Sequence, residues 1–182
     1  MLGGDDADGA ERQGDKTQSD QHRAAKVRRH ACIRPGAGRR GRQRARLVLA
    51  DPRATDMRQH AWRTLQFKPD ADVALLNALL HTVIEEGLTD DAFIRDRTLE
   101  YDALRQHVQA YSPEAMAPLC GIAASTLREV ARAYATSPAA MIFWGMGVSQ
   151  HVHGTDNARC LIALCAVTGQ IGKPGSGLHP LR

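Results

Sequence analysis

The chain has 182 residues, with 24 Lys and Arg against 20 Asp and Glu, and a 43% apolar share although only 4% is aromatic. This length fits one domain or part of a larger one, with a core of Leu, Ala, Val and Ile. The longest apolar run, residues 160–167, is far shorter than the roughly 20 residues that cross a bilayer, and the first residues lack the apolar stretch of an export signal. This pattern excludes a membrane-spanning helix, and we expect a cytoplasmic protein without membrane contact.

Charge divides the chain near residue 46. Residues 1–46 carry 12 basic and 6 acidic side chains, whereas residues 47–182 carry 12 and 14. The first segment has no aromatic and few apolar residues, so we predict that it is disordered. Its stretch 23–46 holds ten basic residues and no acid, which is compatible with a nucleic-acid-binding arm or with unselected, frame-shifted sequence. We favour the second explanation, because the stretch lacks interleaved aromatics and any helix-turn-helix or finger pattern.

Predicted strands and helices alternate after this segment. Residues 47–50 form an apolar run that ends at a turn, which indicates a short buried strand. Apolar residues at helical spacing predict a helix over 70–86, which Gly87 ends. Capping residues, early acids and apolar spacing predict further helices over 91–97, 101–110, 113–119 and 125–136.

The second predicted strand covers residues 139–144, which are apolar at odd and even positions alike. This pattern is typical of a strand covered by helices on both faces, so we predict a central strand beside that of Val48 and Leu49. A last helix is predicted from about residue 155 to just before Gly172, followed by a tail of turns. The alternation predicts an α/β fold with a parallel sheet, of which only part is present.

Candidate chemistry gathers after the two strands. Asp51 follows the first strand, at the edge where ligands bind and where an acid can accept ribose hydroxyls; a plain turn aspartate is the alternative. Gly145 and Gly147 follow the second strand, where they either let a ligand approach the backbone or form a tight turn. The polar residues of 150–160 favour a loop lining a cofactor pocket over a metal site. The four cysteines form no C-x-x-C pair, and three are expected to be small buried hydrophobes in a reducing compartment.

Several longer phrases occur in a fixed order along residues 47–182. They are Leu-Val-Leu-Ala-Asp-Pro-Arg-Ala-Thr (47–55), Leu-Gln-Phe-Lys-Pro-Asp-Ala-Asp-Val-Ala-Leu-Leu-Asn-Ala (65–78), Tyr-Ser-Pro-Glu (111–114), Ile-Phe-Trp-Gly-Met-Gly-Val-Ser-Gln-His-Val-His-Gly-Thr-Asp-Asn-Ala-Arg (142–159) and a last phrase at 164–182. With these phrases the chain resembles the catalytic alpha subunit of molybdenum- or tungsten-dependent formate dehydrogenases, especially the NAD-linked kind, within the molybdopterin oxidoreductases.

The resemblance implies that residues 47–182 are a partial α/β domain that binds bis(molybdopterin guanine dinucleotide) with Mo or W. Asp51, Arg53 and Thr55 match the strand-end motif that meets one guanosine end of this cofactor. Asp72 matches the acid that faces guanine in the family's Gly-Thr-Asp phrase. That phrase reads Asp-Ala-Asp here, so the glycine of the family turn is replaced by Asp70.

Further roles are implied for the end of the chain. Gly145, Met146, Gly147 and Gln150 match the loop packed against the pterin and phosphates. Arg182 matches the arginine that orients formate at the metal centre, a task that suits the planar donors of a guanidinium.

The resemblance also indicates what the chain lacks. The family carries a Cys or selenocysteine metal ligand followed by His, and cysteines for iron–sulfur clusters, and no such phrase precedes residue 47. We therefore assign no metal ligand or iron–sulfur ligand, and expect an internal fragment that is inactive alone. In the intact enzyme its partners would be formate, an NAD- and flavin-binding beta subunit and a gamma subunit. Two alternatives stay open: a small basic nucleic-acid-binding protein that uses residues 23–46, and a carrier or assembly module for a molybdopterin nucleotide.

Overall fold

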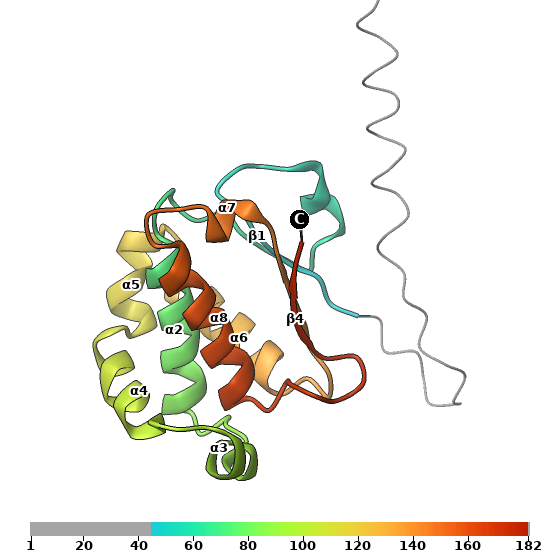
Figure 1. Ribbon diagram of the computed structural model, residues 1–182. Helices are drawn as coiled ribbons and strands as arrows, with labels where there is room; N and C mark the ends of the chain where they lie inside the picture. The colour runs from blue at the N-terminus through green and yellow to red at the C-terminus, as the bar shows by residue number, and fades with distance from the viewer. Residues whose placement is uncertain (1–44, 182) are drawn as a thin grey trace, which may run out of the picture. The chain divides into compact units, whose positions relative to one another are not determined.

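Two pairs of short parallel strands organise the computed structural model, which describes residues 45–181 (Figure 1). Strand β1 (Val48–Ala50) pairs with β2 (Arg63–Leu65), and the 3-10 turn η1 (Asp56–His60) lies on the connection between them. Strand β3 (Met141–Trp144) pairs with β4 (Gly177–Pro180) in a second sheet. Because both pairs are parallel, the carboxyl ends of paired strands lie at the same edge of their sheet.

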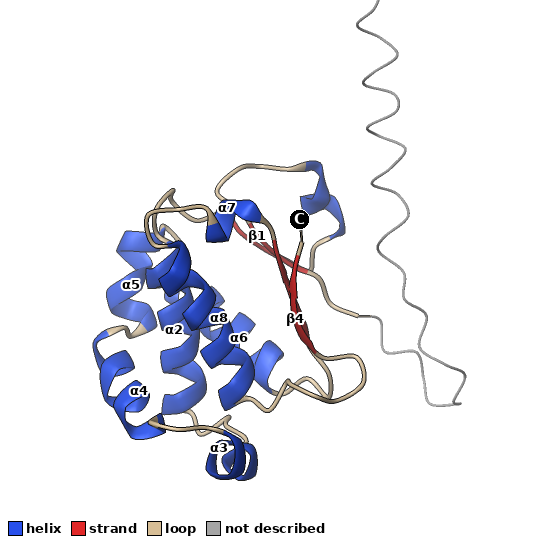
Figure 2. Ribbon diagram, viewed as in Figure 1, coloured by secondary structure: helices blue, strands red, loops and turns tan. Residues whose placement is uncertain are grey.

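Helices form the larger part of the described chain, and Figure 2 shows most of them gathered beside the strands. The longer ones pack around α2, which contacts α5, α6 and α8. None of the helices within residues 45–181 is long and apolar enough to cross a membrane. The helices and their bounds are α2 (Asp72–Glu85), α3 (Asp91–Arg97), α4 (Tyr101–His107) with the 3-10 turn η2 (Val108–Ala110), α5 (Pro113–Cys120), α6 (Ala124–Ala135), α7 (Met146–Ser149) and α8 (Gly154–Val167).

The core lies where α2, α6 and α8 meet. Leu80 and Val83 of α2 and Leu127 of α6 are fully buried, and Leu164 of α8 and Leu65 of β2 join the same cluster. Burial of each such side chain contributes about 1.5–3 kcal/mol. Since β2 and α8 share this core, it supports the partner strand of β1 and the helix that follows β3 and α7.

Local sequence signals account for the helix ends. The Asp90 carboxylate accepts a hydrogen bond from the main-chain N–H of Phe93 at 3.0 Å, and the Ser112 hydroxyl accepts one from that of Ala115 at 3.2 Å. Such caps typically stabilise a helix by about 1 kcal/mol. Gly121 ends α5 in the left-handed region, with φ of 74°. The helices predicted up to α6 are confirmed, although the last turn of the one over 101–110 is 3-10 rather than α.

Ion pairs bind the outer faces of three helices together. Arg128 of α6 contacts Glu85 of α2 at 2.7 Å and Glu114 of α5 at 2.9 Å, while Arg132 contacts Glu86 at 2.6 Å. The hydrogen bonds from Arg132, helped by the charge of Arg128, hold the pKa of the Glu86 carboxyl below its usual value. These contacts lie on the surface, so they add less stability than the core.

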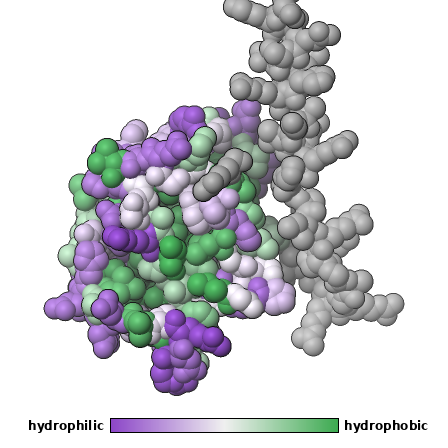
Figure 3. Space-filling model, in the orientation of Figure 1, coloured by the Kyte–Doolittle hydropathy of each residue, from purple (hydrophilic) through white to green (hydrophobic). Residues whose placement is uncertain are grey.

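The predicted surroundings of β3 are wrong in two respects. β3 pairs with β4 and not with β1, and within residues 45–181 the two strand pairs form separate sheets. Helices cover one face only, because Ile142 packs on the core whereas Met141 is 37% and Phe143 55% exposed. Figure 3 shows apolar side chains, in green, exposed on the face of the molecule turned toward the viewer. The apolar run alone could not reveal the pairing, since β4 lies in the tail that was expected to form turns.

Candidate functional site

The carboxyl end of β1 turns sharply at Asp51. Its carboxylate accepts hydrogen bonds from the main-chain N–H of Arg53 at 2.8 Å and from the Arg53 Nε at 3.4 Å, and the Arg53 side chain is 84% exposed. Gln66, which follows β2, donates from Nε2 to the carbonyl of Pro52 at 3.3 Å. Gln66 therefore joins the predicted residues, and the sequence did not indicate it because β2 was not predicted.

Thr55 ends this turn at the start of η1. Its backbone is extended and its side chain caps no helical N–H. The hydroxyl Oγ1 is buried, with no hydrogen-bond partner among the described residues. A buried polar atom left without a partner typically costs about 1–3 kcal/mol, so Thr55 holds a hydroxyl that an outside group could satisfy.

The turn before α2 carries Asp70 at the position where the family resemblance implies glycine. Asp70 adopts the left-handed backbone with φ of 69°, a conformation that Asp tolerates better than most residues. Lys68 anchors the turn to α5, because its main-chain N–H donates to the Cys120 carbonyl at 2.9 Å and its Nζ donates to the Pro118 carbonyl at 2.9 Å. Asp72 is half-buried as the first residue of α2.

The carboxyl end of β3 runs through Gly145 into α7. Gly145, Met146, Gly147 and Gln150 are all exposed, and the Gln150 main-chain N–H closes the turn on the Met146 carbonyl at 2.7 Å. A Cβ atom built on Gly145 or Gly147 would meet no atom within 4 Å. Neither glycine has a positive φ. Hence neither the backbone nor the packing of residues 45–181 requires glycine at these two positions.

Helix α8 holds α7 in place through one hydrogen bond and one close backbone approach. Asn157 donates from Nδ2 to the Val148 carbonyl at 3.1 Å, and its Oδ1 is buried without a partner in the described part of the chain. Gly154 lies so close to α7 that an added Cβ would stand 2.0 Å from the Ser149 carbonyl oxygen. Here a side chain is excluded by the neighbouring backbone.

One contact joins two of the predicted groups. His151 Nε2 lies 3.3 Å from an oxygen of the Asp70 carboxylate, which links the loop after α7 to the turn before α2. Within residues 45–181, the hydrogen bond from Gln66 to the Pro52 carbonyl is the one polar contact that joins residues 51–55 to residues 66–72, and none joins them to residues 145–153. In the view of Figure 1, η1 and α7 both lie toward the upper end of the ribbon. Arg182 lies outside the described residues.

Three cysteines lie within residues 45–181, and none of them forms a disulfide there. Cys120 and Cys165 are buried, and half-buried Cys160 contacts Asn77 Oδ1 through Sγ at 3.5 Å. Burial raises the pKa of the Cys160 thiol to about 11. The described residues include no group of three or more His, Cys, Asp or Glu side chains that could hold a metal ion. Cys32 lies outside the described residues.

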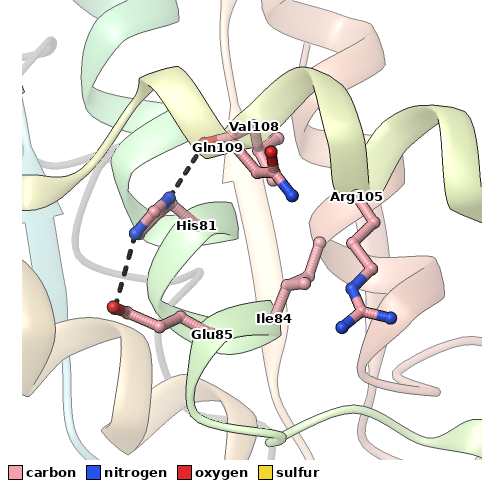
Figure 4. A pocket seen from close by; sticks show the side chains of 6 residues that line it. All are labelled: His81, Ile84, Glu85, Arg105, Val108 and Gln109. Atoms are coloured by element: carbon pink, nitrogen blue, oxygen red, sulfur yellow. Dashed lines mark hydrogen bonds and ion pairs between the residues drawn. The ribbon is translucent and has the colours of Figure 1, made fainter.

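A small hollow of about 290 Å³ opens between α2 and the end of α4 (Figure 4). His81 donates from Nδ1 to the Val108 carbonyl at 2.9 Å, and its Nε2 lies 3.4 Å from Glu85. None of the predicted site residues lines this hollow. Its lining residues are His81, Ile84, Glu85, Arg105, Val108 and Gln109.

Comparison of the sequence with known proteins identifies relatives of this chain. The model of the molybdopterin oxidoreductase family matches residues 26–182. Formate dehydrogenase H of Escherichia coli (strain K12) is 39% identical over 141 residues, which cover 78% of this chain and 20% of that protein. The F420-dependent formate dehydrogenase 1 subunit alpha of Methanococcus maripaludis is 37% identical over 137 residues, again 20% of its length.

A solved structure agrees with the sequence relatives. Acetylene hydratase from Pelobacter acetylenicus matches 73% of this chain and 18% of its own, with a TM-score of 0.68 and 26% sequence identity. The chain thus spans about one fifth of the length of the relatives it matches. Both comparisons point to one group of proteins, and the chain belongs to the molybdopterin oxidoreductase family.

Proposed function

We propose that this chain is a segment of a formate dehydrogenase catalytic subunit and that residues 45–181 form part of its pocket for bis(molybdopterin guanine dinucleotide). The names of the two relatives at 37–39% identity support formate as the substrate of the intact enzyme. The single observation that carries the binding proposal is the buried hydroxyl of Thr55, which has no hydrogen-bond partner within residues 45–181 and lies two residues from an exposed arginine at a strand end.

The residues present fit such a group in two further ways. Open space beside Gly145 and Gly147 leaves room for a bulky ligand to reach the backbone, and no contact within residues 45–181 explains these glycines. Only one oxygen of the Asp51 carboxylate, Oδ1, is engaged by Arg53, so Oδ2 is available to accept ribose hydroxyls. The donors and the acid therefore suit a nucleotide with anionic phosphates.

We assign roles on this basis. Asp51, Arg53 and Thr55 hold one guanosine end, and Asp72 accepts from the N–H groups of guanine. Gly145, Met146, Gly147 and Gln150 pack against the pterin and phosphates. Arg182 orients formate through paired hydrogen bonds to its carboxylate.

When bound, the Mo or W cofactor supplies the two-electron redox chemistry that converts formate to CO2. The chain's own residues bind and orient, since no thiolate ligand or iron–sulfur motif is assigned to it. We expect the purified chain to show no formate-dependent dye reduction above an empty-vector background. In the intact enzyme, which we place in the cytoplasm, beta and gamma subunits would carry the electrons onward to NAD.

The test is Thr55→Val in the full chain, with guanosine monophosphate as the probe. Removing a hydroxyl that has no internal partner should leave the free energy of unfolding unchanged or raise it by up to about 1–2 kcal/mol. The same change should weaken nucleotide binding measured by calorimetry or NMR titration. Nucleotide affinity should therefore fall without any loss in the free energy of unfolding.

Thr64→Val is the matched control, because Thr64 is an exposed residue of β2. It should leave nucleotide affinity unchanged. The proposal fails if Thr55→Val destabilises the chain and leaves nucleotide affinity as it was, since the hydroxyl would then serve the fold alone.

A further inference from the structure

We propose that Asp70 and His151 form a clasp that holds the loop of residues 145–153 against the turn before α2. The clasp is the contact between the Asp70 carboxylate and the His151 imidazole. It joins the turn beside Asp72, which the proposed function assigns to guanine, to the loop that it assigns to the pterin and phosphates, so its consequence for binding rests on that function. The contact itself does not.

The backbone at Asp70 is the first observation. Its φ of 69° lies in the region where residues with a side chain are disfavoured by roughly 1–2 kcal/mol, with Asp and Asn the least affected. Asp adopts this conformation more readily than most residues because its short polar side chain can make local contacts. The Asp70 side chain is 70% exposed, and the one partner it has in the described chain is His151 at 3.3 Å.

Hydrogen bonding fixes the orientation of the imidazole. The main-chain N–H of His153 donates to His151 Nδ1 at 3.4 Å, so Nδ1 acts as an acceptor. In the neutral ring the proton then lies on Nε2, which faces the Asp70 carboxylate. The clasp is therefore a close contact between the Nε2 edge of the ring and the charged carboxylate, at 3.3 Å.

No other contact replaces the clasp. On its far side the loop is held by α8, through Asn157 to the Val148 carbonyl and through the Gly154 N–H to the His151 carbonyl at 2.9 Å. Within residues 45–181, no other hydrogen bond or ion pair joins residues 145–153 to residues 66–72. The Lys68 ammonium, the nearest cation in sequence, donates to the Pro118 carbonyl instead. Breaking the clasp should free one side of the loop only.

Amide hydrogen exchange of the full chain tests the clasp without any ligand. Asp70→Asn removes the charged acceptor but keeps a residue that tolerates the left-handed backbone, and His151→Ala removes the donor. Each should speed exchange in residues 146–153 by about two- to fivefold, the range of an exposed ion pair, and leave the α2–α6 core unchanged. Asp70→Gly should loosen the loop equally without loss of thermal stability, because glycine relieves the strained backbone.

Asp96→Asn is the control, since Asp96 makes a comparable exposed pair with Arg95 on α3. Unchanged exchange of residues 146–153 in both Asp70→Asn and His151→Ala would overturn the clasp. A loosened loop with undiminished affinity for guanosine monophosphate would overturn its role in positioning the binding loop; we expect a two- to fivefold loss. If the unaltered chain binds no nucleotide, the proposed function fails, while exchange still decides the contact.

Discussion

Gly154 and Gly147 offer a matched pair of substitutions that tests how α7 is held. The Cβ of Gly154→Ala would stand 2.0 Å from the Ser149 carbonyl oxygen and 2.6 Å from its carbon. The backbone must therefore move by about 1 Å before the contact becomes tolerable, and α7 has to separate from α8. The Cβ of Gly147→Ala meets nothing within 4 Å.

The expected magnitudes follow from these contacts. Overpacking of this kind costs about 1–3 kcal/mol, and alanine returns up to about 1 kcal/mol of helix propensity at the start of α8. Gly154→Ala should thus lower the free energy of unfolding by roughly 1–2 kcal/mol, or the melting temperature by about 4–8 °C. Gly147→Ala should leave stability unchanged or raise it by up to about 1 kcal/mol.

Thermal unfolding followed by circular dichroism measures both variants. Amide exchange supplies the local readout, because Gly154→Ala should also expose residues 146–151. If the two alanines have the same effect on stability, the close approach of α7 and α8 described above is refuted.

Three further predictions concern the rest of the described chain. Ile142→Asp should lower the free energy of unfolding by about 2–4 kcal/mol because it places a carboxylate against the core, whereas Met141→Asp on the open face should lower it by under about 1 kcal/mol. Equal losses in urea unfolding would contradict the finding that helices cover only one face of β3. Arg132 lowers the pKa of Glu86 in the folded state, so the stability that this ion pair adds is present above the ordinary carboxyl pKa and is lost as pH falls through the lowered value. Arg132→Met should therefore reduce the loss of stability on acidification. An unchanged fall of stability at acid pH would count against the pair. Because burial raises its pKa to about 11, the Cys160 thiol should react with iodoacetamide at pH 8 about two orders of magnitude more slowly than a free cysteine. Peptide mass spectrometry measures this rate. Alkylation at the rate of a free thiol would show that Cys160 is not shielded.

Helix positions were predictable because their signals are local. Asp90 and Ser112 act within a few residues of the helix starts that they define, and each side chain accepts a hydrogen bond from a main-chain N–H of its helix. Strand pairing depends on contacts between distant segments. β2 is three residues long and begins with Arg63, whose guanidinium is engaged by Glu129 of α6 at 2.8 Å, so no run of apolar residues marked it.

The site was predictable to the extent that it follows strand ends. Asp51 and Gly145 do follow parallel strands, but Gln66 was missed together with β2. The sequence shows Asp70 where the resemblance implies glycine, but it could not show that Asp70 adopts a left-handed backbone. The link between Asp70 and His151 could not be foreseen, because 81 residues separate them and neither belongs to a helix or a strand.

Guanine recognition at the strand ends tests the central claim most directly. The measurement is an NMR titration of the full, isotope-labelled chain with guanosine monophosphate and, in parallel, adenosine monophosphate. Adenine lacks the paired N–H donors that Asp72 would accept, so it should bind at least about tenfold more weakly, and Asp72→Asn should remove the difference. We predict saturable shifts at residues 51–55, 72 and 145–150. Absence of saturable shifts there, or equal binding of both nucleotides, would contradict the assignment of this unit to the guanosine end of a molybdopterin cofactor.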